Sequence, residues 1–290
     1  FNEKIKKNLK KFETHVANER KLIQTRNNDG LIALYKNFPT IWNGIDEISV
    51  EKLRTQGEYN LFTYYYSGSY FGIEQSITID TIVETIHSFQ NKSVVDTLFS
   101  CLFFAMKETV FAKDGHMAQP LSPVKNIARH LKQRSKSIFP LLIKKLGEFV
   151  VFSSTEKHSN ESKHKIYNLD IKDITKGEIF NNKKIKMIYA DPPYTDMQYS
   201  RYYHLLNVAA NYDFPMPTIS RGKFTSGLYT EGRNQSDLSK KSTAKLRIKE
   251  LCRYCKDNNI TLALSYAYPE DRINQKTNRY TVSIEDLISL

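Results

Sequence analysis

The sequence predicts an α/β protein in which a large, mainly helical region precedes a parallel sheet. Two apolar segments, residues 185–190 and 260–265, have the length and composition of buried strands. A helical pattern at residues 242–255 separates them, and strands that alternate with helices are typical of parallel sheets. In most of residues 1–150, apolar residues instead recur every three or four positions. We therefore expect a helical region at 1–150 and an α/β core at 166–290.

The composition excludes several classes of protein. Of the 290 residues 40% are hydrophobic and 26% charged, which excludes collagen-like and broadly disordered chains. No apolar run is long enough to cross a membrane, and no secretory signal is evident. Three cysteines argue against a disulfide scaffold and are consistent with a reducing compartment. We expect a soluble, cytoplasmic protein.

The charge balance points to a polyanionic partner. The chain has 43 Lys and Arg against 31 Asp and Glu, a formal net charge of +12. Each phosphate that a basic side chain neutralises releases a condensed counterion, which favours binding to nucleic acid. A composition rich in lysine throughout is the alternative explanation. We favour nucleic acid, because net charge bears on association and not on fold.

The helical region is expected to consist of a few long helices. The ranges are 2–26, 74–89, 93–109 and 125–147, with a break or a new first turn at Pro140. Residues 61–66 predict a short strand or a helix end. The Ser-Gly-Ser-Tyr-Phe-Gly segment that follows, residues 67–72, fits a nucleotide-binding loop poorly, and we interpret it as a structural turn. Residues 153–165 predict an exposed linker.

The expected site lies where strands of the α/β core end. Residues 165–169 predict a short strand ending at Asp170, and residues 185–190 run directly into Asp191-Pro192-Pro193-Tyr194. A helix at 199–210 follows. Parallel sheets bind their ligands outside the carboxyl ends of the strands. This position makes the Asp-Pro-Pro-Tyr segment the candidate catalytic site.

The chemistry of this segment suits an aromatic amine. Each proline fixes its own φ and restrains the residue before it, so the turn loses little entropy on ordering. The Asp191 carboxylate and the Pro192 carbonyl can each accept one amine hydrogen, which directs the lone pair of the nitrogen toward an electrophile. Tyr194 can hold a base by stacking. A base inside a duplex is out of reach and must be flipped out.

Here the sequence resembles the amino-group DNA methyltransferases that use S-adenosylmethionine, and Asp in the first place of the motif is typical of adenine-specific members. The specific element is Asp191-Pro192-Pro193-Tyr194 after an apolar strand. Other segments that look like bacterial adenine methylases are Tyr70-Phe71-Gly72, Ile79-Asp80, the GHMAQP segment at 115–120, the QYSRYYHLL segment at 198–206, Arg233, Gln235, Ser236 and Leu264-Ser265-Tyr266.

This resemblance implies a Rossmann-like class I methyltransferase sheet and direct methyl transfer to the N6 amine of a flipped adenine in double-stranded DNA. It implies S-adenosylmethionine as cofactor, with Asp170 at the position that binds the cofactor's adenine and Asp191 beside it; a turn or cap role for Asp170 stays open. Arg201 and Arg233 are candidate phosphate contacts or solvated arginines. The region 1–150 is the candidate for DNA contact. A restriction-modification or phage-defence context, with a partner chain or a restriction nuclease, is an analogy.

One family feature is not found. The glycine-rich cofactor loop, typically Phe-x-Gly-x-Gly, lies before the catalytic strand in relatives, so it either precedes Phe1 or is absent. We expect residues outside this chain to complete the core. A catalytically silent subunit that binds nucleic acid remains an alternative, as does methylation of RNA adenine or of the cytosine amine.

Two other motifs have plainer explanations. Cys252-x-x-Cys255 lies on the apolar face of a basic helix without a second pair, so core packing is favoured over a metal site. His204 follows three aromatic or basic residues on the helix after the candidate site, and we expect it to be a packed histidine.

Overall fold

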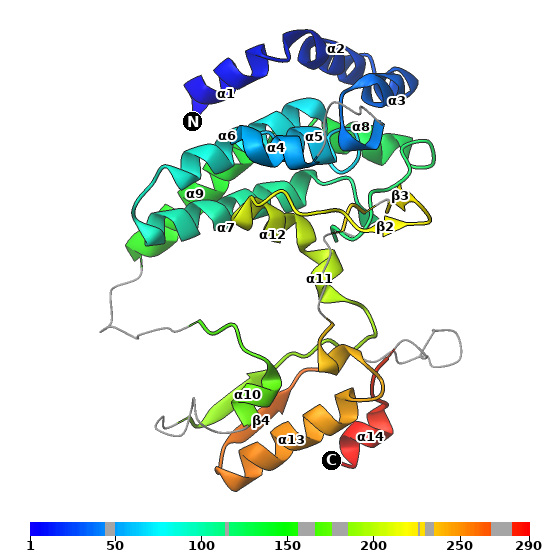
Figure 1. Cartoon of the computed structure of the whole chain (residues 1–290). Coiled ribbons are helices and arrows are strands. Elements are labelled where there is room, and N and C mark those ends of the chain that lie inside the picture. Colours follow the sequence, from blue (N-terminus) through cyan, green and yellow to red (C-terminus); the bar gives the residue numbers. More distant parts are fainter. Residues whose placement is uncertain are drawn as a thin grey trace. The chain divides into compact units, whose positions relative to one another are not determined.

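The computed structural model describes residues 1–43, 50–113, 116–155, 166–175, 185–225, 227–229, 235–267 and 280–290. The protein is mixed α/β and mostly helical, with a small parallel two-stranded sheet in this part of the chain (Figure 1). It divides into two compact units. The helical unit contains Phe1–Ser159 and Arg201–Gly232, and the sheet unit contains Asn160–Ser200 and Arg233–Leu290.

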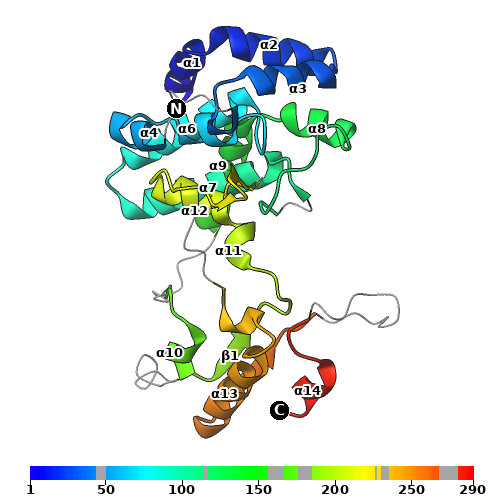
Figure 2. The same cartoon turned by 45° about the vertical axis from the view of Figure 1, so that its right-hand side comes forward.

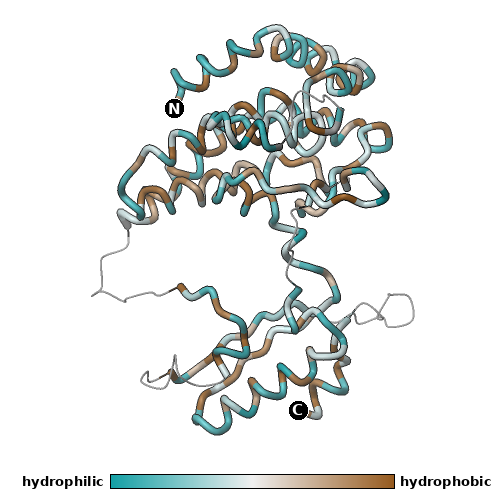
Figure 3. The backbone as a smooth tube through the Cα atoms, in the orientation of Figure 1, coloured by the Kyte–Doolittle hydropathy of each residue, from teal (hydrophilic) through white to brown (hydrophobic). Residues whose placement is uncertain are grey.

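The helical unit is built in layers around α6. Helices α1 to α3 lie on one side of α6, and α7, α9 and α12 lie on the other (Figures 1 and 2). Hydrophobic residues concentrate in the inner helices (Figure 3). The helices are α1 (Asn2–Lys10), α2 (Glu13–Gln24), α3 (Asn28–Asn37), η1 (Ile41–Asn43), α4 (Val50–Gln56), α5 (Leu61–Tyr66), α6 (Ile73–His87), α7 (Lys92–Thr109), α8 (Ile127–Arg134), α9 (Ile138–Thr155) and α12 (His204–Asn211).

Helix α6 is buried on every side. Eleven of its 15 residues are buried, among them the polar Gln75, Thr78, Asp80 and Thr81. The hydroxyls of Thr78 and Thr81 donate to carbonyl oxygens one turn earlier, at 2.7 and 2.8 Å, so they leave no unsatisfied donor. Bonds of this kind offset the cost of burying polar groups, although the Oγ of Ser76 in the same helix is buried with no partner among the described residues.

A carboxylate from another helix caps α6. Glu19 of α2 accepts the backbone N–H groups of Ile73 and Glu74, each at 2.8 Å, and the hydroxyl of Tyr35 at 2.6 Å. Burial raises the pKa of Glu19, while these bonds lower it. The carboxylate approaches this closely because the residue before the helix is Gly72. A Cβ at Gly72 would lie 2.5 Å from Glu19 Oε1, well inside contact distance.

We therefore expect Gly72→Ala to lower the free energy of unfolding by about 1–3 kcal/mol, because the methyl group displaces the capping carboxylate. Gly147→Ala is the matched control. Gly147 lies within α9 with open space around it, so alanine there should stabilise the helix by up to about 1 kcal/mol. Chemical denaturation followed by circular dichroism measures both changes. Equal effects of the two substitutions would contradict the capping role of Glu19.

Residues 201–232 pack with the helical unit rather than with the α/β core at 166–290, to which the sequence assigned them. Leu205, Val208 and Ala209 of α12 are buried in the main hydrophobic core. A hairpin of β2 (Ile219–Ser220) and β3 (Lys223–Phe224) follows, with positive φ at both turn residues, Arg221 and Gly222. Positive φ at both positions is the geometry that two-residue hairpin turns favour.

The sheet unit contains β1 (Met187–Ala190) and β4 (Thr261–Leu264), which pair in parallel with Met187 opposite Thr261. Leu238, Ala244, Ile248 and Val282 form its apolar cluster. The other elements are α10 (Ile171–Thr175), η3 (Asp237–Ser239), α13 (Ala244–Asp257) and α14 (Ile284–Ile288), and α11 (Tyr199–Tyr202) crosses the boundary between the units.

Most expected elements are present, with changes in detail. The pattern at 2–26 forms two helices, α1 and α2, and the pattern at 199–210 forms α11 and α12. The helix after Arg134 begins at Ile138, so Pro140 lies in its first turn as expected. Residues 61–66 are a helix. In the described part of the chain, no helix combines the length and apolar character needed to cross a membrane.

Candidate functional site

The candidate site begins where β1 ends. The amide of Ser265, after β4, donates to the carbonyl of Ala190 at 2.8 Å and continues the ladder to the last residue of β1. The chain then leaves the sheet through Asp191-Pro192-Pro193-Tyr194, with Pro192 buried and Asp191 exposed. The strand thus fixes one end of the motif, and the two prolines restrain its course.

Asp191 faces open space. It lines a pocket of about 620 Å³ together with Pro192 and Pro193. Among the described residues, the Asp191 carboxylate has no hydrogen bond or ion pair, and the carbonyl of Pro192 accepts no hydrogen bond. Two uncommitted acceptors therefore lie on consecutive residues at the carboxyl end of β1. The expectation that this motif follows a strand of a parallel sheet is confirmed. The expectation that this strand is buried is wrong: no residue of β1 is buried, and Met187 and Tyr189 are 57% and 67% exposed.

Asp170 lines the same pocket as Asp191. Its Oδ1 accepts the backbone N–H of Lys172 at 3.0 Å, so Asp170 caps α10, and its other carboxylate oxygen has no partner in the described part of the chain. The predicted strand at 165–169 is wrong: residues 166–169 form no strand, and Ile166 is 98% exposed. No described strand pairs with this segment, and an extended chain without a paired neighbour is not a strand.

Tyr194 lies on an aromatic cluster instead of in this pocket. Its ring is nearly parallel to that of Tyr280, with 6.1 Å between the centroids, and edge-on to Tyr266 at 6.0 Å. The carbonyl of Tyr194 accepts the amide of Thr281 at 3.0 Å and the hydroxyl of Tyr266 at 3.2 Å. The sequence pointed to Tyr266 through its strand end, but nothing in the sequence pointed to Tyr280 or Thr281.

A cluster of ion pairs holds the pocket wall together. Asp237 of η3 contacts Lys172 of α10 at 3.0 Å, Lys240 at 3.1 Å and Arg247 of α13 at 3.1 Å. The hydrogen bond from Lys172, followed by those from Lys240 and Arg247, holds the pKa of Asp237 well below its usual range. The neighbouring Leu238 lines the pocket. Asp237 thus joins three elements around the site.

Of the two candidate phosphate contacts, the structure describes Arg201 and not Arg233. Arg201 lies in the helical unit, with its guanidinium carbon 4.6 Å from the centre of the Tyr229 ring and Nη2 3.2 Å from the Tyr229 hydroxyl. This is a cation–π contact on a half-buried side chain. Arg233 lies outside the described residues. His204 is 2% exposed, and its Nε2 is 2.9 Å from the carbonyl oxygen of Met117, so it is the packed histidine that the sequence predicts.

Residues 67–72 form a closed turn, as expected. Gly68 has φ +74°, and a Cβ there would lie 2.6 Å from the Cβ of Tyr35. The amide of Gly68 donates to the carbonyl of Phe71 at 2.8 Å and closes the turn. Arg134 donates to the carbonyls of Ser69 and Tyr70 at 2.8 and 3.1 Å. The glycine at 68 thus provides a left-handed conformation and close packing.

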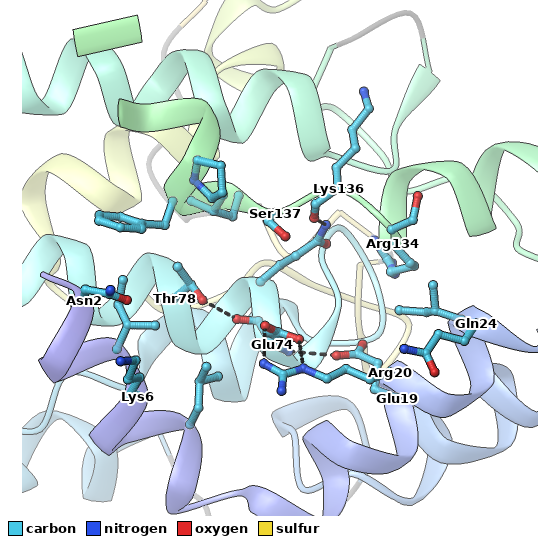
Figure 4. Close-up of a pocket in the computed structure, with 18 residues that line it drawn as sticks. Asn2, Lys6, Glu19, Arg20, Gln24, Glu74, Thr78, Arg134, Lys136 and Ser137 are labelled. Carbon is cyan, nitrogen blue, oxygen red and sulfur yellow. Dashed lines mark hydrogen bonds and ion pairs between the residues drawn. The ribbon is translucent and has the colours of Figure 1, made fainter. Parts of the chain in front are cut away.

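A polar pocket of about 540 Å³ lies between α1, α2, α6 and the connection from α8 to α9 (Figure 4). Its charged side chains bind one another or the backbone. Arg20 donates to both carboxylate oxygens of Glu74 at 2.7 Å, Glu19 caps α6, and Lys136 donates to the carbonyl of Glu108 at 2.5 Å. These charges stabilise the fold, and we assign no ligand here.

Two of the three cysteines, Cys252 and Cys255, belong to the packing of α13. Cys255 is 3% exposed, near the buried Leu251 and Ile248, and Cys252 is half-buried against the apolar cluster of the sheet unit. Burial raises the pKa of both thiols. A buried thiol with a raised pKa is a poor nucleophile and a poor metal ligand.

Comparisons with models of protein families, with curated proteins and with solved structures find no match.

Proposed function

We propose that this chain carries the amine-binding motif of an S-adenosylmethionine-dependent DNA methyltransferase, which transfers a methyl group to the N6 amine of a flipped adenine. The proposal rests on the resemblance of Asp191-Pro192-Pro193-Tyr194 to that family and on the geometry of the motif. It includes a Rossmann-like class I core, of which β1, β4 and α13 form a part. The pairing of these two strands in parallel is compatible with such a core.

The observation that carries the proposal is the pair of free acceptors. The Asp191 carboxylate is exposed beside a pocket, and the Pro192 carbonyl is unbonded within the described residues. An exocyclic amine has two hydrogens and a lone pair delocalised into the ring. Bonds from both hydrogens to these acceptors favour a pyramidal nitrogen whose lone pair is available to an electrophile. The negative charge of Asp191 also stabilises the positive charge that develops on the nitrogen.

The pocket fits part of the proposed cofactor. Its volume of about 620 Å³ is within the range of about 300–1,000 Å³ typical of ligand sites. Asp170 and Asp191 supply carboxylate oxygens, which suit the amine, hydroxyl and cationic groups of S-adenosylmethionine. The cofactor supplies the electrophilic methyl group, while the residues of this chain position the amine. The net charge of +12 favours DNA, with Arg201 and Arg233 as candidate phosphate contacts.

The experiment that tests the function identifies the modified nucleoside. The chain is incubated with isotopically labelled S-adenosylmethionine and, in separate reactions, duplex DNA of mixed sequence or RNA, and the nucleic acid is then digested and analysed by mass spectrometry. We expect label in N6-methyldeoxyadenosine. Label in N4-methyldeoxycytidine, or in RNA alone, would show that the protein is a methyltransferase with a different substrate from the one proposed. No transfer, together with no calorimetric heat on titration with the cofactor, would instead indicate a silent subunit.

We expect Tyr194→Ala to lower kcat/KM for DNA about 5- to 150-fold, because a stacked base contributes about 1–3 kcal/mol. Tyr194→Phe retains the ring and should stay within about threefold of the unchanged protein, since the described structure shows no bond to the Tyr194 hydroxyl. Steady-state assays with a flipped or mismatched adenine substrate measure both values. A large loss in the phenylalanine variant would exclude stacking as the role of this ring.

A further inference from the structure

A second, smaller pocket in the helical unit has the character of a base-binding site. It has a volume of about 310 Å³ and lies between the end of α3, the turn that follows α5, and the segment before α8. Its walls are mostly apolar, with Ile32, Pro120 and Pro123 among them. Proline rings and an isoleucine present apolar surfaces without hydrogen-bond donors to a planar ligand. Lys36, which is exposed, stands at the same pocket.

The first polar determinant is a hydroxyl that the fold does not use. Ser67 lines the pocket and is 4% exposed, yet its Oγ has no hydrogen-bond partner among the described residues. Buried polar groups in proteins are nearly always bonded, so such a hydroxyl calls for a ligand or a water. Rotation about the Cα–Cβ bond moves Oγ among three staggered positions, so a small change of rotamer presents it to a ligand.

The second determinant is an amide whose orientation is fixed. Asn43 lines the pocket, and its Nδ2 donates to the carbonyl oxygens of Tyr35 at 3.1 Å and of Phe38 at 2.6 Å. Both amide hydrogens are thereby committed, and Oδ1 is left as an acceptor with no partner in the described part of the chain. The neighbouring Gly68 is packed against Tyr35, which restrains the floor of the pocket.

We propose that this pocket binds a nucleobase. A hydroxyl that can donate and a carbonyl oxygen that accepts are the kinds of group that pair with an acceptor and a donor on the Watson–Crick edge of a base. The apolar walls suit the base faces, and Lys36 suits the attached phosphate. The net charge of +12 also favours a nucleotide over a neutral ligand of the same shape. The source is either a free nucleotide or an unpaired base of a nucleic acid. This inference does not depend on methyl transfer.

The test is calorimetric titration of the whole chain with dAMP, dCMP, dGMP and dTMP, with deoxyribose 5-phosphate as the probe that lacks a base. We expect saturable binding of at least one nucleotide and none of the sugar phosphate. Ser67→Ala should weaken that binding about tenfold. It should leave the melting temperature unchanged or raise it, because removing an unsatisfied buried hydroxyl costs the fold nothing.

Two further experiments show which residue contacts the phosphate and whether the base belongs to a free nucleotide or to a nucleic acid. Lys36→Ala should weaken dAMP without weakening deoxyadenosine, and Ser135→Ala, whose hydroxyl bonds to the Lys132 carbonyl away from this pocket, should weaken neither. Binding of single-stranded oligonucleotides that is lost at an abasic position identifies a nucleic-acid base, whereas binding of mononucleotides alone identifies a free nucleotide. The proposal is overturned if the sugar phosphate binds equally well, if Ser67→Ala leaves binding unchanged, or if no nucleotide binds at millimolar concentration.

Discussion

Replacing Asp191 with alanine is expected to reduce methyl transfer about 10²- to 10³-fold, the loss typical when one preorganised electrostatic contact to a developing charge is removed. Asp191 has no hydrogen bond or ion pair in the described part of the chain, so its removal deletes no contact of the fold. We therefore expect the free energy of unfolding to change by less than about 0.5 kcal/mol. Steady-state transfer assays and chemical denaturation of the same preparation give the two values.

Two further variants separate charge from position. Asp191→Asn keeps one acceptor oxygen and loses the charge, so its activity should lie between those of the unchanged protein and the alanine variant. Asp196→Ala removes another exposed aspartate from the same loop, one that does not line the pocket, and should leave transfer unchanged. If Asp191→Ala retained full activity, or if Asp196→Ala lost as much, the role of the first residue of the motif would be refuted.

Asp191 has no ion pair within the described residues, and this bears directly on the chemistry. A carboxylate paired with a lysine or arginine has its negative charge neutralised and its oxygens occupied, as the three cations around Asp237 show. Such a group is a poor acceptor for a neutral amine. Within the sheet unit, Asp237 thus organises structure, whereas Asp191 is left available for a ligand. This contrast separates the residue available to a ligand from the residue that holds the surrounding elements together.

The position of the motif at the end of a strand was predicted correctly because the signal is local. An apolar run ends at Asp191 and two prolines follow, so strand, strand end and turn are all encoded within ten residues. Tyr280 could not be predicted in the same way. It reaches Tyr194 through an isolated bridge between Thr195 and Tyr280, which joins segments far apart in the chain. Contacts of that kind depend on tertiary packing and leave no periodic pattern.

The errors in the predicted fold also arise because tertiary packing leaves no local pattern in the sequence. Residues 165–169 contain apolar residues in the spacing of a strand, but a strand also needs a neighbour with which to pair, and Ile166 is exposed. The pattern at 2–26 is continuous, yet the chain breaks near Phe12, whose ring packs 5.9 Å from that of Phe38. Residues 201–232 follow the candidate site in sequence, but the apolar face of α12 belongs to the helical core.

Helix α6 shows most clearly what a hydrophobic pattern omits. The sequence marks Ile79, Ile82 and Val83 as one apolar face, and these residues are fully buried. It does not indicate that Asp80, between them, is 1% exposed. Asp80 accepts the amides of Phe62 and Thr63 at 2.8 Å, the Thr63 hydroxyl at 2.7 Å and the Tyr212 hydroxyl at 2.6 Å. It thereby caps α5 and joins α5, α6 and the end of α12.

We expect Asp80→Asn to lower the free energy of unfolding by about 2–4 kcal/mol at neutral pH. The amide keeps one acceptor oxygen and sets an NH₂ group against buried donors, which then lack partners. Guanidinium unfolding followed by far-ultraviolet circular dichroism, which reports mainly on helices, measures the change. Asp96→Asn is the control, because the Asp96 side chain is 61% exposed and, among the described residues, pairs with Lys92 alone. This substitution should change stability by less than about 0.5 kcal/mol.

The pH dependence of the difference in stability between the unchanged protein and Asp80→Asn tests whether burial or hydrogen bonding dominates the pKa of Asp80. Burial raises its pKa from 3.8 to about 6, against the opposing effect of its four hydrogen bonds. The folded state therefore binds the proton more tightly than the unfolded state does. The resulting stabilisation is fully present below about pH 4 and is lost as the pH rises through about 6. The gap in stability between the unchanged protein and Asp80→Asn should thus be up to about 3 kcal/mol wider at pH 4 than at pH 8. A gap that narrows on acidification would mean that the hydrogen bonds to the carboxylate outweigh its burial, and that Asp80 serves α5 as a charged cap.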